Sequence, residues 1–209
     1  MKDYYWGLEE EKGEVVKKVS SPKENASNND FDIVEFSGNR IFFYSGVSRP
    51  KVLKLNKAVI NLNNNLRSRA ITYGVHEPSP IKLHINSYGG SVFAGLAAVD
   101  YIKKSPVPIE TIIDGCAASA ATLMSVVGAH RSMNKNACML VHQLSGFMWG
   151  KFQEMQDDMQ NSEMLMKKIK SIYREHTRIP EDKMDEILKH DIWWDAEQCL
   201  EYGLIDEIV

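Results

Sequence analysis

The chain has 209 residues, a length that fits one large domain or one domain with a tail. Hydrophobic residues make up 44% and charged residues 25% of it, as in a globular protein with a core, and no apolar run is long enough to span a membrane. The net charge of -3 gives no reason to expect nucleic acid or an anionic membrane as a partner. Its three cysteines form no CxxC pair, so we expect neither disulfides nor a zinc site, and we expect a cytoplasmic protein.

The first 29 residues differ in composition from the rest of the chain. They are polar and charged and end in "SSPKENASNND", a composition that buries too little apolar surface to offset the entropy of ordering. We predict a flexible N-terminal arm over residues 1–29 and a folded domain over residues 30–209. The domain opens with "FDIVEFSGNRIFFYSGV", where β-branched and aromatic residues alternate with turn signals and predict strands.

Strand–turn–helix units follow in succession. Helical spacing of apolar residues over 52–69 precedes the predicted strand "PIKLHIN", the turn "SYGGS" and a helix over 92–104. The strand "PVPIETIID", the turn and helix "GCAASAATLMSVVGA" and the strand "ACMLVHQ" come next. This order predicts parallel strands joined by right-handed crossovers, and therefore an α/β fold.

A long amphipathic helix is predicted over about 150–177. Two interpretations fit its apolar stripe: it packs on the core like the other helices, or it projects and buries methionines against another subunit. The stripe consists of Phe152, Met155, Met159, Ser162, Met166, Ile169 and Tyr173.

A short final helix is predicted to begin at Asp195, with Gln198 in the capping-box position, and to end at Gly203 before the strand "LIDEIV".

Ser119 is the most notable polar residue in the apolar stretch "DGCAASAATLMSVV". It follows a glycine turn and opens a predicted helix, where unpaired backbone N–H groups face an anion formed beside its hydroxyl. A serine needs a base within hydrogen-bond reach to act as a nucleophile. His142, at the end of "MLVHQLSG", is the best-placed candidate base, and Asp191 is a candidate orienting acid. Each residue also has a structural interpretation: a packed serine, a core histidine and a helix-capping aspartate.

Several segments together resemble the Clp protease proteolytic subunit family. They are "INSYGGSVFAGLAAVDYIKKSPVPIETIIDGCAASAATLM", "MLVHQLSG" and "DIWWDAEQCLEYGLIDEI", and the resemblance runs from about Phe31 to the C-terminus. It implies a spiral of βαβ units with a projecting handle helix, and a serine endopeptidase without metal or organic cofactor. Tyr88 and Leu144 depart from the family pattern, which has proline at both positions.

The resemblance also implies roles for individual residues. Ser119, His142 and Asp191 match the catalytic triad. Gly90 and Ala120 match the two backbone N–H donors of the oxyanion hole, and Gly146 and Gly150 match glycines of the strand that lines the substrate groove.

The partners implied are further copies of the chain and an AAA+ unfoldase of the Clp type. The copies are expected to form a heptameric ring, with two rings closing a chamber in a double-ring assembly. Two alternatives remain at this point: a catalytically silent ring subunit that binds or modulates a Clp ATPase, and an acyl-CoA hydratase of related fold. The second does not need serine, histidine and aspartate at these positions.

Overall fold

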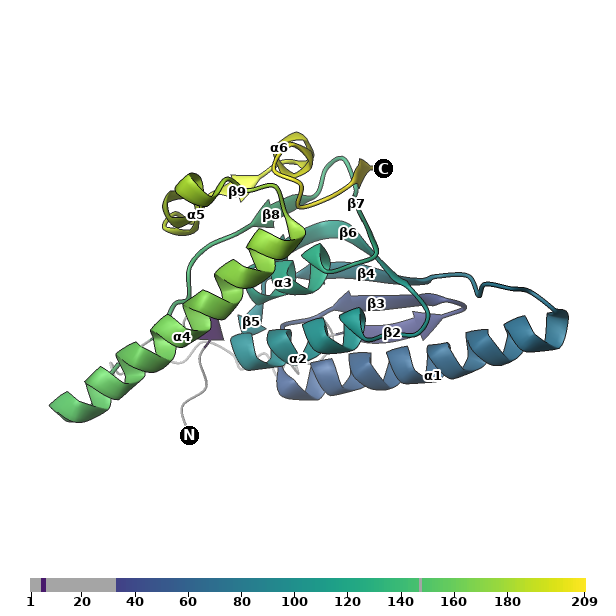
Figure 1. Cartoon of the computed structure of the whole chain (residues 1–209), viewed down its shortest axis with the longest axis horizontal. Coiled ribbons are helices and arrows are strands. Elements are labelled where there is room, and N and C mark those ends of the chain that lie inside the picture. The colour runs from purple at the N-terminus through teal and green to yellow at the C-terminus, as the bar shows by residue number, and fades with distance from the viewer. Residues whose placement is uncertain (1–4, 7–32, 147) are drawn as a thin grey trace, which may run out of the picture.

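The computed structural model describes residues 5–6, 33–146 and 148–209. A largely parallel sheet runs through this region in the order β10-β7-β6-β4-β3-β2, and β8 pairs with both β6 and β9 (Figure 1). The α/β class and the parallel strand pairing predicted from the sequence are confirmed. The strands are β2 Ile33–Ser37, β3 Arg40–Tyr44, β4 Ile81–Ser87, β6 Ile109–Ala118, β7 His130–Met133, β8 Cys138–Leu140, β9 Trp193–Trp194 and β10 Glu207–Ile208.

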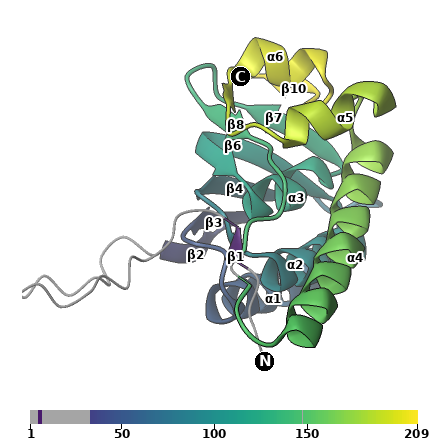
Figure 2. The same ribbon diagram turned by 90° about the vertical axis from the view of Figure 1, so that its left-hand side faces the viewer.

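Six helices connect these strands within the described residues. Figure 2 shows α2, α3 and α4 on one side of the sheet, and α5 and α6 beside the C-terminal strand. The helices are α1 Arg49–Tyr73, α2 Val92–Lys103, α3 Ala120–Val126, α4 Phe152–His176, α5 Glu181–Leu188 and α6 Ala196–Glu201.

Alternating burial along the central strands explains how the sheet attaches to the helices. In β4, Ile81, Leu83 and Ile85 are fully buried, while the residues between them are half-buried. Side chains of a strand point alternately to its two faces, so one face of β4 packs against the helices. Val92, Val99 and Ile102 supply the buried face of α2, as the helical spacing predicts.

The two ends of β6 pair with different strands on the same edge. Residues 110–113 of β6 pair with β7, whereas Cys116, Ala117 and Ala118 pair with β8 on the same edge. The segment "HRSMNKN", between the predicted helix and the predicted strand "ACMLVHQ", contains β7, a strand that the sequence pattern did not reveal. Helix α5 was also not predicted, because its eight residues lie within a mostly charged segment.

Helix α4 combines the two interpretations of its apolar stripe. Its C-terminal half packs into the core through Leu165, Ile169 and Tyr173, which are buried. Its N-terminal half extends beyond the rest of the chain, with Phe152 and Met159 exposed (Figure 1). The final helix agrees with the prediction: the side chain of Asp195 accepts a hydrogen bond from the Gln198 amide, and Gly203 has a φ of 67°.

The predicted N-terminal arm lies outside the described residues except for β1, Tyr5–Trp6. This short strand pairs antiparallel with β5, Gly90–Ser91, which forms a separate two-stranded sheet at the turn after β4.

Candidate active site

Ser119 stands at the junction between β6 and α3 in a strained backbone conformation. Its φ is 61° and its ψ is -130°, and among the described residues it is the only non-glycine residue with positive φ. An L-amino acid in this region costs about 1–3 kcal/mol, and such strain persists only where surrounding contacts enforce it. The residue is 1% exposed. The sharp turn places a hydroxyl-bearing residue where a strand ends and a helix begins.

Buried hydrogen bonds hold this turn in place. The amide of Ser119 donates to the carbonyl of Leu140 in β8, over 2.9 Å. The carbonyl of Ser119 accepts from the amide and the hydroxyl of Thr122, over 2.9 and 2.6 Å. The Thr122 hydroxyl lies 2.5 Å from the hydroxyl of Tyr173 in α4. Because the proton of Thr122 is engaged with Ser119, Tyr173 is the donor in this second bond. Sequence reasoning missed Thr122 and Tyr173, since nothing in their spacing links them to Ser119.

His142 and Asp191 face each other through the pairing of β8 with β9. In this antiparallel pair, Leu140 lies opposite Trp193. When the register is continued by two residues, His142 lies opposite Asp191, with both side chains on the same face. The Nδ1 atom of His142 lies 2.6 Å from an Oδ1 atom of Asp191. His142 is nearly buried, whereas the carboxylate side chain is 73% exposed. The apolar residues that follow Asp191 in the sequence therefore leave its carboxylate open to solvent.

The environment of His142 favours its neutral form. Burial lowers the pKa of its imidazole below the usual value of 6.5, and the charge and hydrogen bond of Asp191 oppose this effect. A neutral imidazole is the form that accepts a proton, so the site suits a general base.

Gly89 and Gly90 bring a second segment against Ser119. A Cβ atom at Gly89 would lie 2.6 Å from the Cβ of Ser119 and 2.9 Å from its Oγ. Gly89 also has a φ of 94°, which favours glycine. Gly89 is therefore the residue whose missing side chain leaves room for the Ser119 hydroxyl.

The backbone N–H and C=O groups of Gly90 both face the same edge of strand β5. Val47 occupies the other edge: its amide donates to Gly89 O, and its carbonyl accepts from the Ser91 amide, both over 2.7 Å. Successive peptide groups of a strand point in opposite directions, so Gly90 presents its N–H and C=O to the edge on which β1 lies, with Trp6 opposite Gly90. This edge therefore accepts an extended chain segment beside Ser119.

The remaining predicted site residues lie around the same strand ends. Ala120 is the first residue of α3, where backbone N–H groups lack partners within the helix. Gly146 and Gly150 lie in the exposed segment between His142 and α4. In that segment the amide of Leu144 lies 3.1 Å from the sulfur of Met166 in α4.

A second histidine–aspartate pair lies on the half-buried face of the sheet. His84 Nδ1 is 3.0 Å from Asp114 Oδ2, and Tyr44 and Asn134 also donate to this carboxylate. Burial and Asp114 raise the pKa of Tyr44 to about 12. Asp114 precedes Ser119 by five residues, which in a strand corresponds to about 16 Å. This pair is therefore too far along the strand to serve Ser119.

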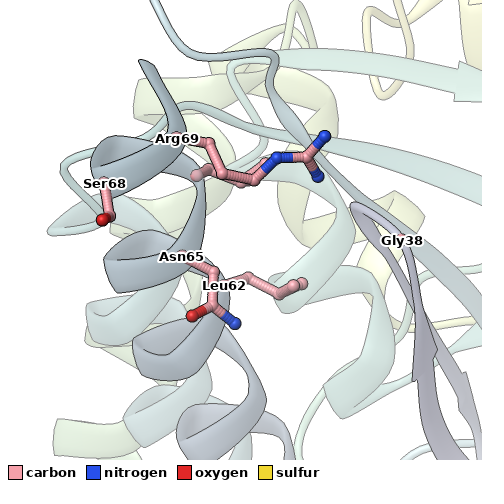
Figure 3. Close-up of a pocket in the computed structure, with 6 residues that line it drawn as sticks. Gly38, Leu62, Asn65, Ser68 and Arg69 are labelled. Atoms are coloured by element: carbon pink, nitrogen blue, oxygen red, sulfur yellow. The ribbon is translucent and has the colours of Figure 1, made fainter. Parts of the chain in front are cut away.

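Two cavities of the structure lie away from the candidate site. One of about 310 Å³ is lined by α1 and the β2–β3 turn, with Arg69 reaching toward Gly38 (Figure 3). Another of about 370 Å³ lies between α1 and α2. Neither includes Ser119, His142 or Asp191 among its lining residues. At the candidate site itself, Ser119 and His142 are buried and only Asp191 is exposed.

Comparison with known proteins identifies the family. The family model described as Clp protease matches residues 56–209, close to three quarters of the chain. The chain belongs to the Clp protease family. All seven predicted site residues lie within the matched range.

A named relative agrees with this assignment. The chain is 37% identical over 131 residues to the ATP-dependent Clp protease proteolytic subunit 1 of Streptomyces avermitilis. The match covers 62% of this chain and 60% of that protein's length. The Clp protease family is one of serine peptidases, and its α/β fold agrees with the sheet and helices described above. In the described part of the chain, no helix has the length and apolar character needed to cross a membrane.

Proposed function

We propose that the chain is a serine endopeptidase in which Ser119 is the nucleophile, His142 the general base and Asp191 the residue that orients the imidazole. One observation carries this proposal. A strained serine at the end of β6 is hydrogen-bonded to β8, the strand that leads into His142, whose ring contacts Asp191 over 2.6 Å. The three residues are separate in the sequence. Ser119 directly follows β6, His142 follows β8 by two residues, and Asp191 precedes β9 by two residues.

The reaction follows from the protonation states of these groups. Neutral His142 removes the hydroxyl proton while the Ser119 oxygen attacks the peptide carbonyl, and the resulting imidazolium is stabilised by Asp191. The proton then passes to the leaving amine, the C–N bond breaks, and an ester of Ser119 remains. Water, activated by His142, hydrolyses this ester and regenerates the hydroxyl.

Two backbone N–H groups are proposed to stabilise the negative charge on the carbonyl oxygen. Gly90 presents its N–H to the edge beside Ser119, and Ala120 lies at the first turn of α3. Substrate is proposed to bind as an extended strand on the edge of β5, with Gly146 and Gly150 in the segment on its other side.

We also propose a ring-shaped assembly supplied with unfolded chains by an AAA+ unfoldase. The exposed N-terminal half of α4 supports this assembly, because Phe152, Met155 and Met159 form an apolar surface suited to a second copy. We propose a heptameric ring, and pairing with a second ring would enclose the site in a chamber.

An active-site phosphonate tests the proposal directly. We expect the Ser119 oxygen to attack the phosphorus of a fluorophosphonate and displace fluoride. The wild-type protein should then gain the mass of one phosphonate group. Ser119→Ala should show no adduct. Ser125→Ala is the matched control, because Ser125 is equally buried in the same helix and should leave labelling intact.

The same experiment separates the alternatives. If the assembled, folded wild-type protein is not labelled, the chain is a silent ring subunit and the proposed chemistry is wrong. Labelling that persists in Ser119→Ala would assign the nucleophile to another residue.

A further inference from the structure

Tyr88 and Trp193 form an exposed aromatic pair at the candidate active site. Tyr88 is 69% exposed and Trp193 42% exposed, and their rings contact edge to face with centroids 6.3 Å apart. Tyr88 follows β4 directly and precedes Gly89, which lies against Ser119. Trp193 lies opposite Leu140, the residue whose carbonyl binds the Ser119 amide.

The two side chains reach across the ends of the intervening strands. Their strands are three neighbours apart, in the order β4, β6, β8 and β9. At about 4.8 Å per neighbour, β4 and β9 are about 14 Å apart. Ring centroids only 6.3 Å apart therefore require both side chains to extend toward each other across β6 and β8, the strands that precede Ser119 and His142. Asp191, which contacts His142, precedes Trp193 by two residues.

The pairing of β1 on β5 gives the direction in which an extended chain runs past this pair. Tyr5 lies opposite Ser91 and Trp6 opposite Gly90, so a strand on this edge runs antiparallel to β5, in the direction from Ser91 through Gly90 toward Gly89. A peptide seated in the same way, with its reactive carbonyl at the Gly90 N–H, directs the two residues after the scissile bond toward Tyr88 and Trp193.

We propose that Tyr88 and Trp193 form an apolar subsite for the side chains of the first two residues after the scissile bond. This inference rests on the proposed function and adds a substrate class to it: peptides with an aromatic or large aliphatic residue at one of these positions. Aromatic rings bury large apolar areas and pair favourably with other rings. Differences of this kind in an apolar subsite are worth roughly 10- to 200-fold in kcat/KM.

Quenched fluorescent peptides that vary only in the two residues after the scissile bond test this subsite. The wild-type protein should prefer Phe or Leu over Ser or Asp by at least about tenfold in kcat/KM. Tyr88→Ala and Trp193→Ala should remove this preference mainly through KM, while Tyr88→Phe and Trp193→Phe retain it. Tyr101→Ala, which removes an exposed aromatic side chain of α2, is the matched control and should keep the wild-type preference.

An ester substrate with a small leaving group separates the two proposals, because it has no residue after the scissile bond. Its hydrolysis therefore reports on the Ser119 chemistry without requiring the proposed subsite. If the ester is hydrolysed and the wild-type protein shows no preference among the peptides, the subsite does not exist and the peptidase proposal stands. If neither the ester nor any peptide is hydrolysed, both proposals are wrong.

Discussion

Ser119→Ala is expected to lower kcat for peptide hydrolysis on the order of 10⁶-fold, because removal of a triad nucleophile removes the covalent route entirely. Residual hydrolysis would come from binding and from the oxyanion donors alone. A fluorogenic peptide assay measures the loss, and Ser125→Ala again provides the control. A decrease of less than about tenfold would show that Ser119 is a packing residue.

Ser119→Gly provides a second comparison at this position, because it separates backbone strain from chemistry. Both variants lose the hydroxyl, but only glycine adopts a φ of 61° without steric cost. We expect the glycine variant to exceed the alanine variant in free energy of unfolding by about 1 kcal/mol. Chemical denaturation of the two inactive proteins measures this difference. A glycine variant less stable than the alanine variant would mean that the turn carries no strain.

Asp191→Asn is expected to reduce kcat by about 10³- to 10⁴-fold, since an amide neither favours the required tautomer of His142 nor stabilises its charged form. The pH profile should change as well. The Asp191 carboxylate raises the pKa of His142 against the effect of burial, so its loss lowers that pKa further. Because activity requires neutral His142, it is lost as the pH falls through this pKa. The acid limb of kcat/KM should therefore move to lower pH in the variant.

Asp195→Asn is the matched control for this change. Asp195 caps α6 through the Gln198 amide, a role that asparagine fills about equally well. It should leave both the rate and the acid limb unchanged. An Asp191→Asn variant with wild-type kcat and an unmoved acid limb would exclude Asp191 from the mechanism and leave its contact with His142 as a structural one.

The strand–turn–helix units could be predicted from the sequence because each has a local pattern. The alternation of β4, the spacing of α2 and the capping box of α6 are all decided within a few residues. Strand β7 and helix α5 lack such patterns. β7 is stabilised by its pairing with β6 and β10, and α5 buries only Met184 and Leu188 in an otherwise charged segment.

The candidate site was only partly accessible from the sequence. The resemblance placed Ser119, His142 and Asp191, but spacing alone left each with a structural interpretation. Their proximity depends on contacts between distant segments: the bond from Ser119 to Leu140 and the register of β8 with β9. The positive φ of Ser119 was equally hidden, because serine has no preference for that conformation.

A crystal structure of the phosphonylated protein tests the central claim most directly. We expect phosphorus bonded to Ser119 Oγ, with the free phosphonate oxygen within about 3 Å of the amide nitrogens of Gly90 and Ala120. His142 should lie between Ser119 and Asp191. A phosphonate on another residue, or one on Ser119 whose oxygen points away from both amides, would contradict the proposed site.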